Sequence, residues 1–316
     1  MTAASSARVR PGAAVTGSDR PAAPRGPGRG RLLGWVFVSP ALVWFLIFIA
    51  GPFVVAVGYS FLSWDLITPA TFVGAGNYAQ LIADPMVWRS LGTTFLFAFA
   101  SVVTHVVGGL LLALLANRQM NRIVSGFFRT AIFFPFLISW AAVSLLWRYV
   151  LDPEFGFVTY YLEQLGIDPP LWFVDPAWAL PGIIGIDFWH TIGYTFVIML
   201  AGLQTVPPQL TEAARVDGAT RWQIFWNITV PMMSPTLFFA TVITFIGAFQ
   251  IFDPMKIITN GGPDNSTKSI VMYLYEQGFQ AFQVGYASAI ALLVFVVIMA
   301  VTALQFWLSR RWVHEG

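Results

Sequence analysis

Long uncharged stretches separate the charged positions of this chain. Six of them are long enough to hold the roughly 20 apolar residues with which a helix crosses the hydrocarbon core of a membrane. Because a backbone in lipid must satisfy its own hydrogen bonds, and because barrel strands would be about ten residues of strict alternation, the pattern predicts six transmembrane helices. They fall within residues 32–64, 90–117, 130–147, 176–211, 222–252 and 277–309.

The composition agrees with this pattern. Of 316 residues, 57% are hydrophobic and only 10% are charged, and the mean hydropathy is +0.70. So few charges cannot cover the surface of a soluble domain, whereas 29 Phe and 13 Trp suit lipid-facing and interfacial walls. We therefore predict an all-α membrane protein and exclude a soluble enzyme.

The remaining composition excludes several kinds of site. The net charge of +2 does not indicate nucleic-acid binding, because six Arg lie within the first 31 residues and no compact basic patch follows. The absence of Cys excludes disulfides, Cys-based metal sites and thiol nucleophiles. The three histidines, His105, His190 and His314, fall on separate predicted elements, so we predict no metal site.

The basic residues predict the orientation, because short loops rich in Lys and Arg stay in the cytoplasm. With the N-terminus inside, the opposite side receives ten acidic residues, and both termini are cytoplasmic. The cytoplasmic segments then hold Arg8, Arg10, Arg20, Arg25, Arg29, Arg31, Arg118, Arg122, Arg129, Arg215, Arg221, Arg310 and Arg311.

The chain divides into a tail and a membrane domain. Residues 1–30 are rich in Ala, Pro, Gly and Arg and cannot bury a core, so we predict a disordered cytoplasmic tail there. Residues 31–316 form the membrane domain, in which the longest outer connection, residues 148–178, has room for a short surface helix around 160–165. There is no GxxxxGK[ST] sequence, so any dependence on ATP must come from a partner.

The connection between the fourth and fifth predicted helices, residues 204–229, is unusual for a membrane loop. Small residues at Ala213, Ala214 and Gly218 let a short helix approach another protein closely, and Gly218 can supply the left-handed turn that ends it. The side chains of Glu212, Arg215, Asp217 and Arg221 offer charged contacts around this apolar centre. The pattern predicts a docking helix on the cytoplasmic face.

This segment resembles the EAA loop of the permease subunits of bacterial ATP-binding-cassette (ABC) importers, which reads E-A-A, three residues, G, about nine residues, I-x-L-P. Here the matching positions are Glu212-Ala213-Ala214, Gly218, Ile228, Val230 and Pro231, with Val230 replacing the usual Leu. The sequences Asp217-Gly218-Ala219 and Thr259-Asn260-Gly261-Gly262-Pro263 narrow the resemblance to carbohydrate importers of the maltose and glycerol-phosphate type. The resemblance covers residues 31–316.

The resemblance implies a type I importer permease in the bacterial inner membrane, with no catalytic residue and no cofactor of its own. A coupling helix in the EAA loop would fit a groove of a separate ATPase, which uses ATP and Mg. The implied partners are a second, similar permease, two ATPase subunits and an external binding protein that delivers a carbohydrate. The predicted coupling residues are Glu212, Ala213, Ala214, Arg215, Asp217 and Gly218.

Asp187 is the only charged residue within the six stretches, and ionisable groups in a membrane usually face a protein interior or a water-filled cavity. Helical spacing places His190, Thr191 and Tyr194 on the same stripe, beside Trp189. Their polar groups and aromatic faces suit a sugar. The alternatives are that Asp187 lies near the outer interface and that His190 only bonds a neighbouring helix.

The resemblance also implies sugar contacts on the helix after the EAA loop, where Thr244, Ala248, Gln250 and Ile251 occupy the corresponding stretch. Only the side chains of Thr244 and Gln250 can donate hydrogen bonds. On the second predicted helix, a stripe of small and polar residues is interpreted as a helix-packing seam rather than a ligand site. This stripe consists of Ser101, Thr104, His105, Gly108 and Gly109.

Two other functions compete with an ATP-driven importer. An ion-coupled secondary transporter would use Asp187 as its proton or cation site, but we detect no internal inverted repeat in the chain. An intramembrane enzyme would need paired catalytic groups at one depth. The chain has a single intramembrane acid and contains neither HExxH nor GxSxG.

Overall fold

The computed structural model of the protein describes residues 27–117 and 121–310. The expected tail, residues 1–30, overlaps these described residues only at its last four positions. The chain divides into two compact units, Met1–Pro52 and Phe53–Gly316.

The described part of the first unit, which begins at Pro27, is helical and mainly apolar. Helix α1 (Pro27–Phe45) passes through Pro40 and continues as a π-helical turn over Leu46–Ala50. Helix α2 (Gly51–Tyr59) follows without a break in the chain. Residues Gly34–Tyr59 together form a candidate membrane span of 26 residues, as the first uncharged stretch predicts.

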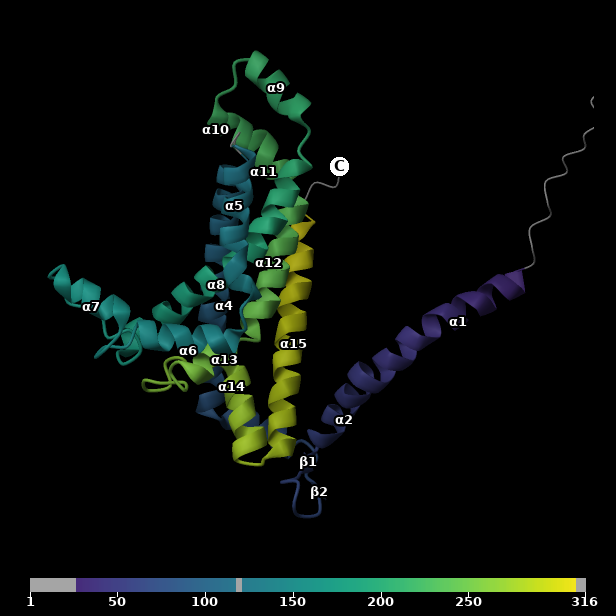
Figure 1. Cartoon of the computed structure of the whole chain (residues 1–316). Helices are drawn as coiled ribbons and strands as arrows, with labels where there is room; N and C mark the ends of the chain where they lie inside the picture. The colour runs from purple at the N-terminus through teal and green to yellow at the C-terminus, as the bar shows by residue number, and fades with distance from the viewer. Residues whose placement is uncertain (1–26, 118–120, 311–316) are drawn as a thin grey trace, which may run out of the picture. The chain divides into compact units, whose positions relative to one another are not determined.

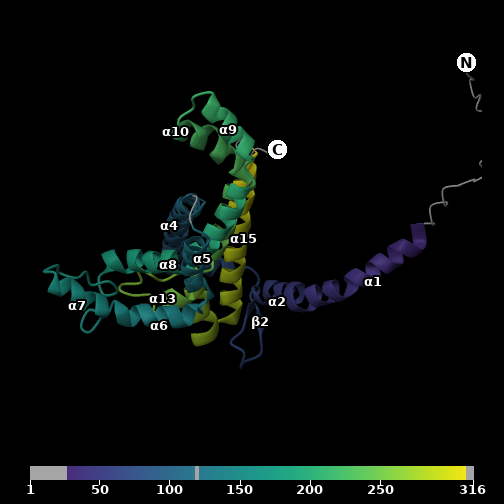
Figure 2. The ribbon, with the colours of Figure 1, turned by 45° about the horizontal axis from the view of Figure 1, so that its top comes forward.

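Among the described residues, the second unit contains four helices of 16 residues or more. Figure 1 labels all four, and Figure 2 shows the bundle turned by 45°. Two of them begin at an aspartate whose carboxylate accepts a backbone hydrogen bond, Asp84 and Asp175, each followed directly by proline. This arrangement satisfies an amide that the first turn leaves unpaired. The four helices are α4 (Pro85–Ala116), α8 (Pro176–Gln204), α12 (Ser234–Phe249) and α15 (Val284–Ser309).

Shorter elements lie at the two ends of this bundle. Figure 1 shows α9 and α10 at one end, and α14 with the β1–β2 hairpin at the other. At the first end are α9 (Pro208–Val216), α10 (Arg221–Ile224) and α11 (Val230–Met232). The remaining short elements, not all of which lie at an end, are β1 (Leu62–Ser63), β2 (Thr71–Phe72), α3 (Gly76–Ala83), α7 (Phe157–Gln164), α13 (Asp253–Ile257) and α14 (Ile270–Tyr275).

The third uncharged stretch is not one continuous helix, which corrects the prediction for residues 130–147. The chain forms α5 (Arg122–Phe133), a 3-10 turn over Phe134–Leu137 and α6 (Trp140–Val150), and it bends by 98° between the two halves. Pro135 lacks the amide hydrogen that a continuing helix needs, and Ile138 is extended. The described part of the chain thus has five membrane-length helices, or six if this bent pair counts as one.

Close packing of α4 against α8 organises the second unit. Gly108 and Gly109 of α4 lie against Phe188 and Thr195 of α8, and a Cβ atom at Gly108 would lie 2.6 Å from the Phe188 ring. The predicted packing seam is therefore confirmed at these two glycines. Helix α12 also packs on α4 and on α8, so these three helices form one packed group.

Candidate functional site

A cavity of about 330 Å³ lies between α4, α8 and α12. The rings of Phe136 and Trp140, from the turn between α5 and α6, cover one side of it. The bend between α5 and α6 brings these two aromatic rings to the cavity. The polar side chains that line the cavity are Ser101, His105, Asp187, Thr191, Tyr194, Thr195 and Thr244.

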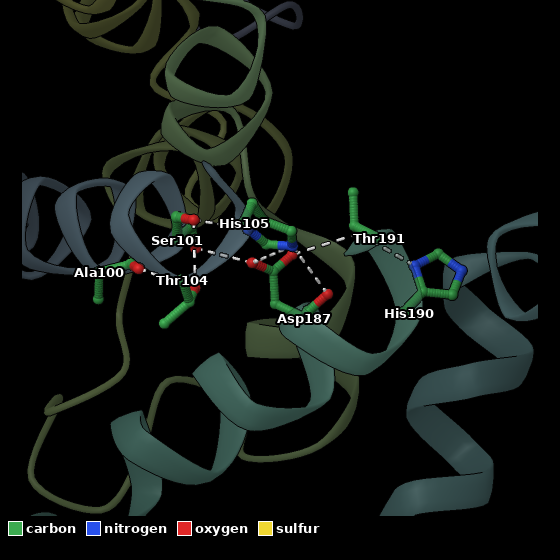
Figure 3. Close-up of polar contacts among 7 residues, drawn as sticks. All are labelled: Ala100, Ser101, Thr104, His105, Asp187, His190 and Thr191. Atoms are coloured by element: carbon green, nitrogen blue, oxygen red, sulfur yellow. Dashed lines mark hydrogen bonds and ion pairs between the residues drawn. The ribbon is translucent and has the colours of Figure 1, made fainter. Parts of the chain in front are cut away.

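Asp187 is the centre of a hydrogen-bonded cluster (Figure 3). The hydroxyl of Ser101 on α4 donates to Asp187 Oδ2 at 2.7 Å, and the hydroxyl of Thr191 lies 3.5 Å from Oδ1. His105 Nε2 lies 3.8 Å from Oδ2. Asp187 is 5% exposed, so these groups stand in for the water that a carboxylate normally binds.

His105 is also buried and uses both ring nitrogens. Its Nδ1 lies 2.6 Å from the carbonyl oxygen of Ser101, one turn earlier on α4. Its Nε2 lies 3.3 Å from the backbone carbonyl oxygen of Asp187, on α8. The imidazole therefore joins α4 to α8 at the depth of the acidic side chain.

Six of the nine residues predicted for the substrate path line this cavity. They are Asp187, Thr191, Tyr194, Thr244, Ala248 and Ile251.

The other three are elsewhere. His190 Nε2 bonds the carbonyl oxygen of Ile138 at 2.9 Å, and its ring packs on Trp140 away from Asp187 (Figure 3). The structure thus favours the alternative in which His190 bonds a neighbouring segment. Trp189 packs edge-on against Trp147, and Gln250 is exposed at the end of α12.

Ser101 and His105 of the α4 stripe contact Asp187 on α8 and also line the cavity, so at these two positions the stripe packs against α8 and faces the cavity as well. Their spacing of four residues places them on one helix face, and this was the available signal. The sequence pattern does not say which helix faces Asp187. Among the described residues, no group of three His, Asp or Glu side chains has the arrangement of a metal site.

The loop with the EAA pattern forms the predicted short helix. Helix α9 ends at Val216, and Gly218 follows with a φ of +83°, the left-handed turn expected of it. The amide of Ala219 donates to the carbonyl of Ala214 at 2.9 Å, which closes the turn. Glu212, Ala213, Arg215, Asp217 and Gly218 are exposed and Ala214 is partly exposed, so this surface is available to another protein.

A second acidic cluster lies at the other end of the bundle. Asp84 Oδ2 accepts hydrogen bonds from the hydroxyls of Tyr273 at 2.5 Å and Tyr286 at 2.6 Å, and Oδ1 accepts from the Met86 amide at 2.8 Å. Partial burial raises the pKa of Asp84, but these hydrogen bonds outweigh it and hold the pKa below its ordinary value. Burial and the bond to Asp84 raise the pKa of Tyr273.

The loop after α13 forms a tight turn. Asn260 and Gly261 adopt φ values of +49° and +80°, which Gly and Asn accept most easily. The Arg89 guanidinium donates to the carbonyl oxygen of Asp264, and the ammonium of Lys268 pairs with Glu276 at 2.9 Å. These contacts tie the loop to α4 and to the segment after α14.

Comparison with known proteins agrees with this arrangement. The family described as "Binding-protein-dependent transport system inner membrane component" matches residues 105–314. The probable ABC transporter permease protein YurN of Bacillus subtilis is 35% identical, over 88% of this chain and 96% of its own length. The lactose transport system permease protein LacF of Rhizobium radiobacter is 33% identical, over 88% and 94%.

A solved structure has the same fold. A chain from the bacterial alginate ABC transporter, solved in complex with a periplasmic protein bound to an alginate pentasaccharide, has a TM-score of 0.79 and 26% identity. The match covers 91% of this chain and 97% of that one. The chain belongs to the family of binding-protein-dependent transport system inner membrane components, which are multi-pass transport proteins rather than enzymes.

Proposed function

We propose that the chain is the permease subunit of an ATP-driven importer and forms half of a translocation path for a sugar or sugar derivative. The observation that carries the proposal is the exposed helix α9, which presents Glu212, Ala213 and Ala214 and ends at the left-handed Gly218. A polar cavity within the same bundle supplies a place for the solute.

The partners follow from this assignment. Six spans form half of a path, so a second, similar permease completes it, and two ATPase subunits that bind ATP and Mg²⁺ receive the two coupling helices. An external binding protein delivers the solute, as in the related alginate transporter, which was solved with its periplasmic protein. Each coupling contact must differ in free energy between the inward-open and outward-open states, because equal contacts shift no equilibrium.

A carbohydrate is the solute class that the relatives and the cavity support together. LacF is named for lactose, and the solved relative transports alginate, an acidic polysaccharide. In this chain the hydroxyls of Thr191, Tyr194 and Thr244 line the cavity and can exchange hydrogen bonds with sugar hydroxyls. The ion-coupled alternative built on Asp187 finds no support in this family, whose name specifies dependence on a binding protein.

The proposal is tested by uptake of radiolabelled lactose, maltotriose and glycerol 3-phosphate into cells that contain the complete transporter. We expect uptake of a carbohydrate from this set that stops when the ATPase gene is deleted. A protonophore should leave uptake intact while ATP is maintained. Uptake that survives loss of the ATPase, or no uptake of any of the three, would overturn the assignment.

A further inference from the structure

The charges on the wall of the cavity form one pair. Among the described residues that line it, Asp187 is the only carboxylate and His105 is the only basic side chain. The walls from α12 and from the α5–α6 turn carry apolar groups and the Thr244 hydroxyl, and Tyr194 is the remaining titratable group. His190, the nearest other histidine, faces Ile138 and Thr191 instead.

Both ring nitrogens of His105 face oxygen atoms. A neutral imidazole has one N–H donor and one lone pair, whereas an imidazolium has two donors. Both nitrogens of His105 face oxygen acceptors: Nδ1 faces the Ser101 carbonyl at 2.6 Å, and Nε2 faces the Asp187 carbonyl at 3.3 Å with the carboxylate beyond it at 3.8 Å. Only the imidazolium places a proton in front of both oxygens.

The partner of this cation is the Asp187 carboxylate. The hydroxyls of Ser101 and Thr191 donate hydrogen bonds to this carboxylate, and such donors stabilise an ionised acid. At exposures of 1% for His105 and 5% for Asp187, either charge alone would be costly, and each offsets the desolvation of the other. The pair therefore has no net charge to offer a solute.

We propose that the His105–Asp187 pair neutralises the cavity from within, so that this subunit's part of the path accepts uncharged, hydroxyl-rich solutes and disfavours anionic ones. An anion entering the cavity would lose its hydration and find no unpaired cation among the described lining residues. An uncharged sugar would find the hydroxyls of Thr191, Tyr194 and Thr244. The inference rests on the proposed transport function.

The charge of the cavity can be measured without knowing the sugar, because the chain contains no Cys. In the assembled transporter, a Thr244→Cys reporter is reacted at pH 7.5 with an anionic methanethiosulfonate, the ethylsulfonate reagent, and a cationic one, the ethyltrimethylammonium reagent. The ratio of the two rate constants reports the local potential. The matched control is an Ile67→Cys reporter in the loop between β1 and β2, where the side chain is 84% exposed.

In the parent chain we expect a ratio near that of the Ile67→Cys control. Replacing His105 by Gln should lower the anionic-to-cationic ratio about tenfold, because it leaves the Asp187 carboxylate unpaired. Replacing Asp187 by Asn should leave the ratio near that of the parent chain, because His105 then gives up its second proton, and the double variant should also show the parent ratio. The ratio at Ile67→Cys should not change. An unchanged ratio in His105→Gln, or a cavity thiol that reacts with neither reagent, would overturn the proposal.

A second measurement does not depend on the reporter. With ¹⁵N-labelled histidine, the three imidazole rings of the chain give three pairs of nitrogen signals, and His190→Gln and His314→Gln assign them. We expect the doubly protonated signature for His105 at pH 7 and its loss in Asp187→Asn. A neutral His105 in the parent chain contradicts the proposal. Neither measurement requires transport, so a failure of sugar uptake with the expected signals would count against the proposed function alone.

Discussion

At Asp84, a single carboxylate holds three segments that are distant in sequence. It caps the first turn of α4 and accepts hydroxyl bonds from Tyr273 of α14 and Tyr286 of α15. Its pKa in the folded chain lies below the ordinary value of about 3.9, because the ionised form is the one that these donors stabilise.

Asp84→Asn should therefore lower the melting temperature of the transporter most strongly near pH 7. A lowered pKa adds stability that is fully present above about pH 4 and is lost as the pH falls through the folded-state pKa. The difference between parent and variant should thus shrink on acidification, measured by thermal unfolding in detergent. Asp168→Asn, on an exposed loop, is the control and should show no such trend. An equal difference at every pH would contradict this account.

Some residues of the candidate site could be predicted from the sequence, and others could not. Asp187 could be selected from the sequence because it is the only charge in a membrane-length stretch. His105 could not, because its role depends on which faces of α4 and α8 meet, and hydrophobic periodicity does not say which pairs of helices pack. His190 shares a stripe with Asp187 in sequence, but the carbonyl of Ile138, freed by the bend, turns its ring away.

At the scale of elements, long apolar helices were predictable and the broken one was not. Apolar content and length identify α4, α8, α12 and α15, and the small residues with Gly218 identify the short helix α9. The bend between α5 and α6 depends on Pro135 and on the tertiary partner of the freed carbonyl group. Proline within a membrane helix is tolerated when neighbours satisfy the backbone, so the residue alone does not predict a break.

Gly218→Ala should impair coupling while the chain still inserts into the membrane. At a φ of +83° an alanine is strained by about 1–2 kcal/mol, although its Cβ would meet no atom within 4 Å. We expect reduced stimulation of ATP hydrolysis by the loaded binding protein, measured in proteoliposomes. Gly218→Asn is the matched control, because Asn tolerates the left-handed region, and it should retain most of the coupling. Equal activity of both variants would show that the turn is not required.

At the scale of the whole molecule, the distribution of charge predicts which end faces the cytoplasm. The segment of α9 and α10 carries Arg215 and Arg221 beside the acidic Glu212 and Asp217. Asp84 lies at the start of α4, and Glu276 follows α14. The positive-inside rule predicts that α9 faces the cytoplasm.

Cysteine labelling tests this orientation on the chain's Cys-free background. An impermeant maleimide added to intact spheroplasts should label Ile67→Cys and leave Val216→Cys unlabelled until the membrane is opened. Both side chains are more than 80% exposed, so accessibility within the fold does not distinguish them. Labelling of Val216→Cys in intact spheroplasts would reverse the orientation.

The length of α4 separates the two acidic clusters. Its 32 residues span about 48 Å, whereas the hydrocarbon core is about 30 Å thick, so a helix of this length along the membrane normal would extend about 18 Å beyond the lipid tails. His105 lies about 17 Å from the Ala116 end and about 30 Å from Pro85. Asp84, at the start of α4, is only half-buried, whereas Asp187 is 5% exposed and has His105 and the hydroxyls of Ser101 and Thr191 in place of water.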